Sequence, residues 1–179
     1  MPAKAEPDQA QGFSLWLMPE GEPHDRLAAW IERLSARYRT RPFQPHLTLL
    51  AGVTGSQADL LDAARRAARS LAPFVVHCSG VEGREQHFRC LFLRAVLDQA
   101  LRGAQERTAR AFAREPEASF LPHVSLVYGS LLPEQKAAVT EELRALGALS
   151  FEVGRLHVWR TEGRVPDWRE LGAFALLRR

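Results

Sequence analysis

The sequence has little of what marks secreted, membrane-spanning or disulfide-stabilised proteins. It contains two cysteines, Cys78 and Cys90, too few for the disulfide framework of a small secreted domain. No stretch approaches the roughly 18 consecutive apolar residues of a membrane span. Residues 1–12 lack the apolar run of a secretory signal and are expected to be a disordered lead-in. We therefore expect a cytoplasmic protein with reduced cysteines and no association with a membrane.

Lysine is nearly absent, because 22 of the 24 basic residues are arginines. Arginine suits bidentate recognition of phosphate, but here it is spread through every segment, which indicates a coding bias rather than a binding site. The formal net charge of +3 fits an anionic ligand without requiring one. Apolar residues make up 46% of the chain and charged residues 25%, as in globular proteins. We expect residues 13–179 to form a single domain with two lobes.

Hydrophobic periodicity divides the chain into short strands and amphipathic helices. We expect strands at 13–18, 46–51, 74–81, 88–96, 123–128, 151–159 and 168–177, and helices at 24–38, 57–71, 98–113 and 133–149. This order lacks the regular alternation of a doubly wound sheet, so it predicts an α+β fold. Gly83 permits a turn between the third and fourth strands. A turn centred near Arg84 would place Cys78 and Cys90 roughly opposite each other.

The most informative feature is an internal repeat. Residues 43–50 read Phe-Gln-Pro-His-Leu-Thr-Leu-Leu, and residues 120–127 read Phe-Leu-Pro-His-Val-Ser-Leu-Val. Without gaps, Phe, Pro, His and the second Leu are identical, and a Thr/Ser hydroxyl occupies the same place in both. A predicted helix follows each copy. The repeat therefore predicts a pseudo-symmetric protein with one copy in each lobe.

Each copy has a definite expected geometry. Proline favours an extended conformation in the residue before it, so the chain enters the strand already straight. Side chains alternate between the two faces of a strand, so His46 and Thr48 share one face, as do His123 and Ser125. The aliphatic residues between them take the other face. We expect the aliphatic side to enter the core and the polar side to face a cleft.

Two histidines and two hydroxyls in one cleft suit the hydrolysis of a phosphodiester. One histidine can take a proton from water while the other gives a proton to the departing oxygen. The hydroxyls can donate hydrogen bonds to the non-bridging oxygens, where negative charge grows in the transition state. A single His-x-Thr is more often an edge-strand histidine with a structural hydrogen bond. Two copies within matched eight-residue frames favour catalysis instead.

The two motifs resemble those of the 2H phosphoesterase superfamily, which is named for its paired His-x-Thr/Ser sequences. Within it, the chain is most similar to the plant and yeast type of cyclic phosphodiesterase, through residues 14–19, 88–93 and 123–128 as well as the first motif. This resemblance implies a bilobal α+β fold in which two antiparallel sheets face a central cleft and the helices lie outside. It also implies catalysis without a metal or another cofactor.

The resemblance assigns roles to particular residues. His46 and His123 become the acid/base pair, and Thr48 and Ser125 become the phosphate ligands. Aromatic residues are expected to line the cleft and contact the substrate, although ordinary core packing is an alternative for each: Phe88, Tyr128 and Trp16.

The implied activity is hydrolysis of a nucleoside 2′,3′-cyclic phosphate to the 2′-phosphate, or of ADP-ribose 1″,2″-cyclic phosphate. The alternatives are a 2′-5′ RNA ligase or phosphodiesterase acting on RNA ends, and a noncatalytic nucleotide- or RNA-binding module. No concentrated basic run favours the RNA reading. No obligate protein partner is evident. We expect a bound phosphate to favour the protonated histidines, so the limbs of the pH profile should lie above about 6.5.

A zinc site is the remaining alternative among the potential metal ligands. His77, Cys78, His87 and Cys90 are the residues that could form it. Neighbouring residues in a strand point to opposite faces, so His77 and Cys78 cannot readily share one ion. We therefore predict no metal site.

Overall fold

The computed structural model describes residues 8–144 and 148–177. This part of the chain forms eight strands, four α-helices and two short 3₁₀ turns. The strands are β1 (Phe13–Leu17), β2 (Leu47–Val53), β3 (Phe74–Glu82), β4 (Leu91–Ala95), β5 (His123–Val127), β6 (Leu149–Val153), β7 (Arg155–Arg160) and β8 (Arg169–Ala175). The helices are α1 (Glu22–Tyr38), α2 (Gln57–Arg69), α3 (Gln99–Ala111) and α4 (Pro133–Arg144), and the 3₁₀ turns are η1 (His87–Arg89) and η2 (Val165–Asp167).

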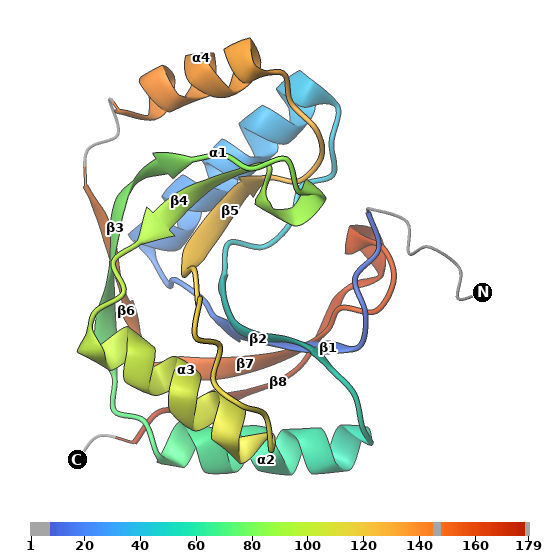
Figure 1. The fold of residues 1–179 in the computed structure, drawn as a ribbon, viewed down its shortest axis with the longest axis vertical. Helices are drawn as coiled ribbons and strands as arrows, with labels where there is room; N and C mark the ends of the chain where they lie inside the picture. The colour runs from blue at the N-terminus through green and yellow to red at the C-terminus, as the bar shows by residue number, and fades with distance from the viewer. Residues whose placement is uncertain (1–7, 145–147, 178–179) are drawn as a thin grey trace.

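The predicted α+β class is confirmed, but the two expected sheets are joined into one. The strand order is β6-β3-β4-β5-β2-β1-β7-β8, and each pair of neighbouring strands is antiparallel. The halves meet where β2 pairs with β5, at Leu47 and Val124. The sheet curls strongly, as Figure 1 shows, so its two halves face each other across the concave side. A short central contact between two four-stranded halves gives the bilobal form that the repeat predicts.

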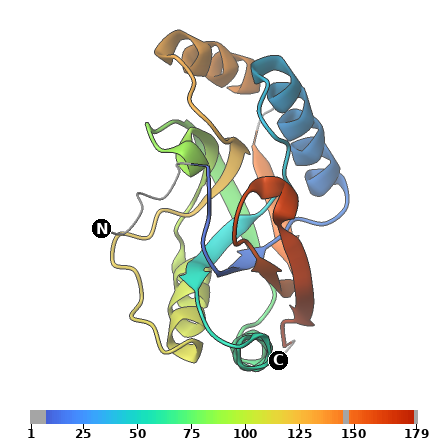
Figure 2. The same ribbon diagram turned by 90° about the vertical axis from the view of Figure 1, so that its right-hand side faces the viewer.

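The helices lie outside the curl in two pairs. Figure 1 shows α1 and α4 together at one end and α2 and α3 together at the other, and the turned view in Figure 2 shows the same grouping. The helices connect the two halves of the sheet. The helix α1, which precedes the first motif, packs against β5, and α3, which precedes the second motif, packs against β2. Glu142 of α4 accepts hydrogen bonds from Arg33 and Arg37 of α1, which ties the first pair together.

Local sequence explains the helices. Ser56 caps α2 by accepting a hydrogen bond from the Asp59 amide, and Asp98 caps α3 in the same way from the Leu101 amide. The inner face of α1 buries Leu27, Ile31, Leu34 and Ser35, at the spacing of one helical face. The aliphatic residues of the two repeated motifs lie in the same hydrophobic core, so the opposite face of β2 and β5 is left for the cleft.

Several predicted boundaries are wrong, and one error has a structural consequence. The expected strand 151–159 is two strands, β6 and β7, interrupted at Gly154. They lie in different halves of the sheet, where β6 pairs with β3 and β7 pairs with β1. The fourth helix ends at Arg144 within the described residues, and part of its predicted range, 145–147, lies outside them.

The predicted facing of Cys78 and Cys90 is also wrong. Cys78 pairs with Ala95 across the hairpin, whereas Cys90 precedes β4. The turn η1 occupies residues that were expected to be strand, which moves the register of the hairpin away from the predicted turn centre. Both cysteines are free thiols.

The expected disordered lead-in is wrong for its last residues. Residues 1–7 lie outside the described part of the chain. Ala10 forms an antiparallel bridge with Gly163, and the Gly12 carbonyl accepts a hydrogen bond from the Thr161 amide. These bonds bring the segment before β1 beside the loop that follows β7. In the described residues, none of the helices has the length and apolar character needed to cross a bilayer.

Candidate active site

The two motifs meet at the centre of the sheet. Leu47 is the registered partner of Val124, and antiparallel strands count in opposite directions. His46 therefore lies across from Ser125, and Thr48 lies across from His123. All four side chains take the face opposite to Leu47 and Val124. The histidine of each motif is thus next to the hydroxyl of the other, and one phosphate between the strands can contact all four groups.

Backbone carbonyls orient both imidazoles in the same way. Nδ1 of His46 lies 2.6 Å from the Gln44 carbonyl oxygen, and Nδ1 of His123 lies 2.8 Å from the Leu121 carbonyl oxygen. A carbonyl can only accept, so Nδ1 must carry a proton in each ring. A neutral ring then has its lone pair on Nε2, and a protonated ring has an Nε2–H donor. Both histidines are therefore preset for proton transfer through Nε2.

The surroundings of the two histidines differ. The ring of His46 stacks on Trp16 with centroids 3.5 Å apart, and only 5% of the residue is exposed. Its Nε2 lies 3.4 Å from the hydroxyl of Tyr128. His123 is partly exposed and lies against Phe92, with ring centroids 4.8 Å apart. His46 is thus the more enclosed member of the pair, although both histidines line the same cavity.

The two hydroxyls also differ. Ser125 is 5% exposed, and its Oγ donates a hydrogen bond of 3.0 Å to the Phe88 carbonyl. Thr48 is partly exposed on the cavity wall. Ser125 must rotate its hydroxyl away from the backbone before it can donate to a phosphate, whereas Thr48 starts without that competing bond.

A cavity of about 170 Å³ lies over these groups. All seven residues predicted for the site line it, and they are Trp16, His46, Thr48, Phe88, His123, Ser125 and Tyr128. The structure therefore brings together every predicted position, while their roles remain a prediction. The aromatic members pack on one another, since the rings of Phe88 and Tyr128 meet edge to face at 5.1 Å.

The lining residues that sequence reasoning missed include one charged and one aromatic side chain. Arg89 lines the cavity next to Phe88, and Trp168 approaches it from the segment before β8. The ring of Trp168 lies 5.9 Å from those of Trp16 and Phe88, centroid to centroid. Nothing in the sequence distinguishes Arg89 from the other arginines of the chain. Trp168 lies at the site because of the strand order of the sheet, which the sequence pattern does not predict.

Burial sets the protonation of the site. It lowers the pKa of His46 from 6.5 to about 3; the Gln44 carbonyl opposes this shift and the charge of His123 adds to it. Burial also lowers the pKa of His123, opposed by the Leu121 carbonyl and helped by the positive charge of Arg89. The pKa of the Tyr128 phenol is raised by burial, so the phenol keeps its proton. Both histidines of the free protein are therefore neutral at pH 7, and the expected rise of the limbs above 6.5 concerns the phosphate-bound pair.

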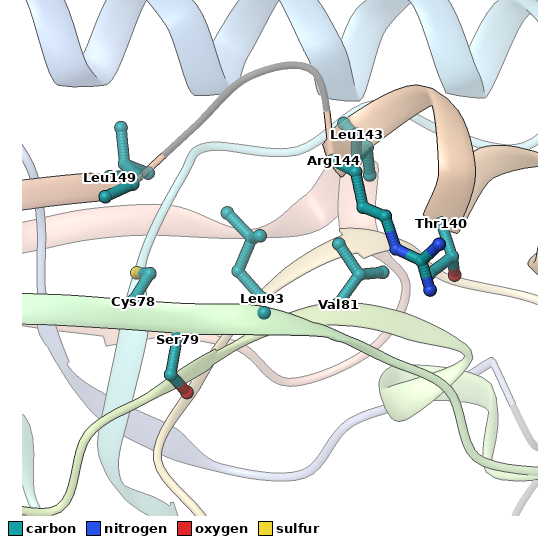
Figure 3. Close-up of a pocket in the computed structure, with 10 residues that line it drawn as sticks. Cys78, Ser79, Val81, Leu93, Thr140, Leu143, Arg144 and Leu149 are labelled. Atoms are coloured by element: carbon teal, nitrogen blue, oxygen red, sulfur yellow. The ribbon is translucent and has the colours of Figure 1, made fainter.

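A larger hollow of about 490 Å³ lies elsewhere, beneath α4 (Figure 3). Cys78 and Leu93 point into it from the sheet, and Arg144 reaches down from the helix. Burial raises the pKa of the Cys78 thiol to about 11, so the thiol is protonated and a poor nucleophile. The described lining residues of this hollow include no acid/base pair, so the smaller cavity is the candidate active site.

The candidate zinc ligands do not converge. His77 contacts Ser150 through Nδ1 at 2.9 Å, and the ring of His87 lies against Phe88 and Tyr128. Over residues 8–144 and 148–177, no three His, Cys, Asp or Glu side chains are grouped so that they could hold a metal ion.

The chain is similar to known proteins of one family. Residues 23–164 match the family model of the 2′-5′ RNA ligase superfamily. The chain is 24% identical to the cyclic phosphodiesterase of Arabidopsis thaliana, in an alignment that covers 84% of this chain and 85% of that protein. It is 28% identical to the 2′,3′-cyclic-nucleotide 3′-phosphodiesterase of Yarrowia lipolytica, covering 90% of this chain and 98% of that protein. A plant and a yeast relative thus confirm the resemblance predicted from the two motifs.

The fold is also found among solved structures. E. coli LigT in its apo form superposes with a TM-score of 0.65 at 16% identity, over 95% of this chain and 99% of LigT. This likeness confirms the predicted fold class.

Proposed function

Because the chain belongs to the 2′-5′ RNA ligase superfamily, the 2H phosphoesterases, we propose that it hydrolyses ribose cyclic phosphates without a metal ion. The expected substrates are nucleoside 2′,3′-cyclic phosphates, opened to 2′-phosphates, and ADP-ribose 1″,2″-cyclic phosphate. The names of the Arabidopsis and Yarrowia relatives support this substrate class.

One observation carries the proposal. The two histidines line one cavity, and each has Nδ1 bound to a backbone carbonyl, so that Nε2 is the nitrogen available for proton transfer. At His46 this atom also lies 3.4 Å from the Tyr128 hydroxyl. A binding module would need donors to the phosphate, but it would not need two imidazoles held in matching tautomers. A matched pair suits a reaction in which one proton is taken and another is given.

The residues account for each part of the reaction. A neutral histidine accepts a proton at Nε2 from a water molecule, which attacks phosphorus. The phosphorus–oxygen bond to the ribose breaks, and the second histidine, protonated, gives its Nε2 proton to the departing ribose oxygen. Thr48 and Ser125 donate hydrogen bonds to the non-bridging oxygens as their charge grows. Arg89 adds a positive charge beside the same oxygens.

The productive state has one proton on the histidine pair. Burial leaves the pair unprotonated in the free protein near neutral pH, because it lowers the pKa of both rings. A phosphodiester brings a negative charge between the rings, which favours protonation of the pair. Binding of the anionic substrate therefore favours protonation of the histidine that acts as the general acid.

The test is turnover of a panel of cyclic phosphates with identification of the products. We expect hydrolysis of adenosine 2′,3′-cyclic phosphate to adenosine 2′-phosphate by the chelator-treated protein. Tight binding without any turnover would favour the noncatalytic module. Turnover of RNA ends alone, with no reaction of the mononucleotide, would favour the RNA enzyme.

A further inference from the structure

The segment that precedes β1 closes one side of the catalytic cavity. We call residues 8–12 the strap, and Ala10, at its middle, lines the cavity together with Trp168. Figure 1 shows the strap rising from the end of β1 next to η2, and Figure 2 shows the same two segments side by side. Asp8 lines a second hollow of about 480 Å³, which shares Tyr128 with the cavity. The strap therefore runs along the border between the two spaces.

The strap continues the ladder between β1 and β7 beyond the rest of the sheet. Phe13 pairs with Arg160, and in the same register Ala10 pairs with Gly163 through two hydrogen bonds of 2.9 Å. On the other side of β1, the strand β2 ends at the residue that pairs with Phe13, so it does not accompany the strap. The strap is thus one half of a two-stranded ribbon, and an isolated two-stranded ribbon is at best marginally stable in water.

Hydrogen bonds and an ion pair tie the strap to the loop that follows β7. Besides the bridge, the Gly12 carbonyl accepts from the Thr161 amide at 2.9 Å, and Oδ2 of Asp8 lies 3.1 Å from Nε of Arg164. Gly12 lies at φ 64°, where a Cβ would come within 2.3 Å of a backbone oxygen of β2, so glycine is needed where the chain leaves the sheet. Because the strap precedes β1, breaking these bonds would let it move without displacing a strand.

The cavity is small for the substrate class proposed above. Its volume is about 170 Å³, whereas pockets for small ligands span about 300–1,000 Å³. A nucleoside cyclic phosphate therefore requires one wall of the cavity to move. The two motif strands contribute their aliphatic residues to the hydrophobic core, so their movement would disrupt packing. The strap is the wall whose movement disturbs the least structure.

We propose that the strap gates the catalytic cavity: it separates from residues 161–164 to admit the substrate and closes again over the bound molecule. With the strap withdrawn, the cavity opens toward the hollow of about 480 Å³, which adds the room that a nucleotide needs. Closure then keeps bulk water away from the reacting phosphate. This inference rests on the proposed function for the identity of the substrate, whereas a binding experiment can follow the motion by itself.

A static strap makes a different prediction. If the segment served only to extend the ladder of β1 and β7, fixing it to the neighbouring loop would raise thermal stability. The rates of ligand binding and turnover would then stay the same.

A disulfide across the ribbon tests the motion. Gln11 and Glu162 are exposed and lie between two hydrogen-bonded positions of the ladder, so Gln11→Cys/Glu162→Cys can lock the strap when it is oxidised. Arg155→Cys/Ala175→Cys is the matched control, because these exposed residues pair beside a hydrogen-bonded position at the other end of β7 and do not line the cavity. Since the native cysteines are free thiols, a count of free thiols shows whether each cross-link has formed.

Stopped-flow fluorescence follows the binding of adenosine 2′-monophosphate, since two tryptophans line the cavity. We expect oxidation to slow association and turnover by at least about tenfold in the strap variant, and reduction to restore both. The control cross-link should change neither rate. Ala10→Pro is a second variant for the case in which the cross-link does not form. It removes the amide that donates to Gly163, and it should speed dissociation of the nucleotide by roughly threefold or more.

The outcomes for the strap and for the reaction are distinct. Equal rates in the oxidised and reduced strap variant would overturn the gate, as would equal dissociation from Ala10→Pro and the wild type where the cross-link does not form. Slower association in the locked protein, without hydrolysis of any cyclic phosphate by the wild type, would support the gate and reject the proposed function. Hydrolysis by the wild type with no effect of the lock would do the reverse.

Discussion

The hydroxyl of Tyr128 lies 3.4 Å from Nε2 of His46, the atom through which that histidine would transfer its proton. The separation is long for a hydrogen bond, and such contacts often tighten when a substrate binds. Because Nδ1 of His46 is held by the Gln44 carbonyl, Tyr128 can donate to the free lone pair of a neutral ring. We therefore predict that Tyr128 positions His46 for proton transfer.

Tyr128→Phe should lower kcat by roughly threefold to tenfold, since it removes an orienting contact but keeps both histidines. The ring still packs on Phe43, whose centroid is 3.8 Å away, so the fold should be retained. Steady-state kinetics that determine kcat and KM separately test this prediction. A rise in KM alone would show that the hydroxyl contacts the substrate and not the histidine.

His46→Gln and His123→Gln should each reduce turnover by roughly 10²- to 10⁴-fold, the scale for loss of a general acid or base. Glutamine is preferable to alanine at position 46, because the buried ring stacks on Trp16 and its removal would leave a gap. Thermal unfolding of each variant is the control. Turnover near that of the wild type in either folded variant would remove that histidine from the mechanism.

Thr48→Ala should reduce kcat by about 10²-fold, whereas Thr48→Ser should have a mild effect because the donor remains. Ser125→Ala should also release the Phe88 carbonyl from its hydrogen bond. We therefore expect Ser125→Ala to affect substrate affinity as well as kcat. The phosphate-binding role fails if the alanine and serine variants at position 48 have the same rate.

Arg89→Gln should weaken transition-state stabilisation and raise the pKa of His123. The second effect follows because the Arg89 charge, after burial, contributes to lowering that pKa. Loss of the charge should thus shift the limb of the pH profile that reports His123 to higher pH. Arg84→Gln is the matched control, since this neighbouring arginine is exposed and does not line the catalytic cavity. An unchanged profile in Arg89→Gln would mean that the guanidinium does not act on His123.

The pH profiles of the free and substrate-bound protein should differ. In the free protein both histidines have a lowered pKa, so the singly protonated pair is populated in acid and is lost as pH rises. The profile of kcat/KM should therefore have its optimum below about 6.5. The bound phosphate raises both values, so the kcat profile should lie at higher pH. Coincident profiles would show that the substrate does not protonate the pair.

The sequence predicted the centre of the site better than its edges. The repeat places the histidine and the hydroxyl of each motif on one face of a strand. Once the two strands pair at Leu47 and Val124, all four side chains lie together. Arg89 and Trp168 depend on contacts between distant segments, and periodicity carries no information about those. The strand 151–159 was predicted as continuous because its apolar run gives no sign that Gly154 divides it between two halves of the sheet.

The most direct test of the central claim is hydrolysis of adenosine 2′,3′-cyclic phosphate after exhaustive chelation, by the wild type, His46→Gln and His123→Gln. The account predicts that the chelated wild type keeps its full rate and a bell-shaped dependence on pH, while both variants lose nearly all activity. Activity that disappears on chelation and returns with one specific metal would contradict it, because the histidines would then be ligands and not the acid and base.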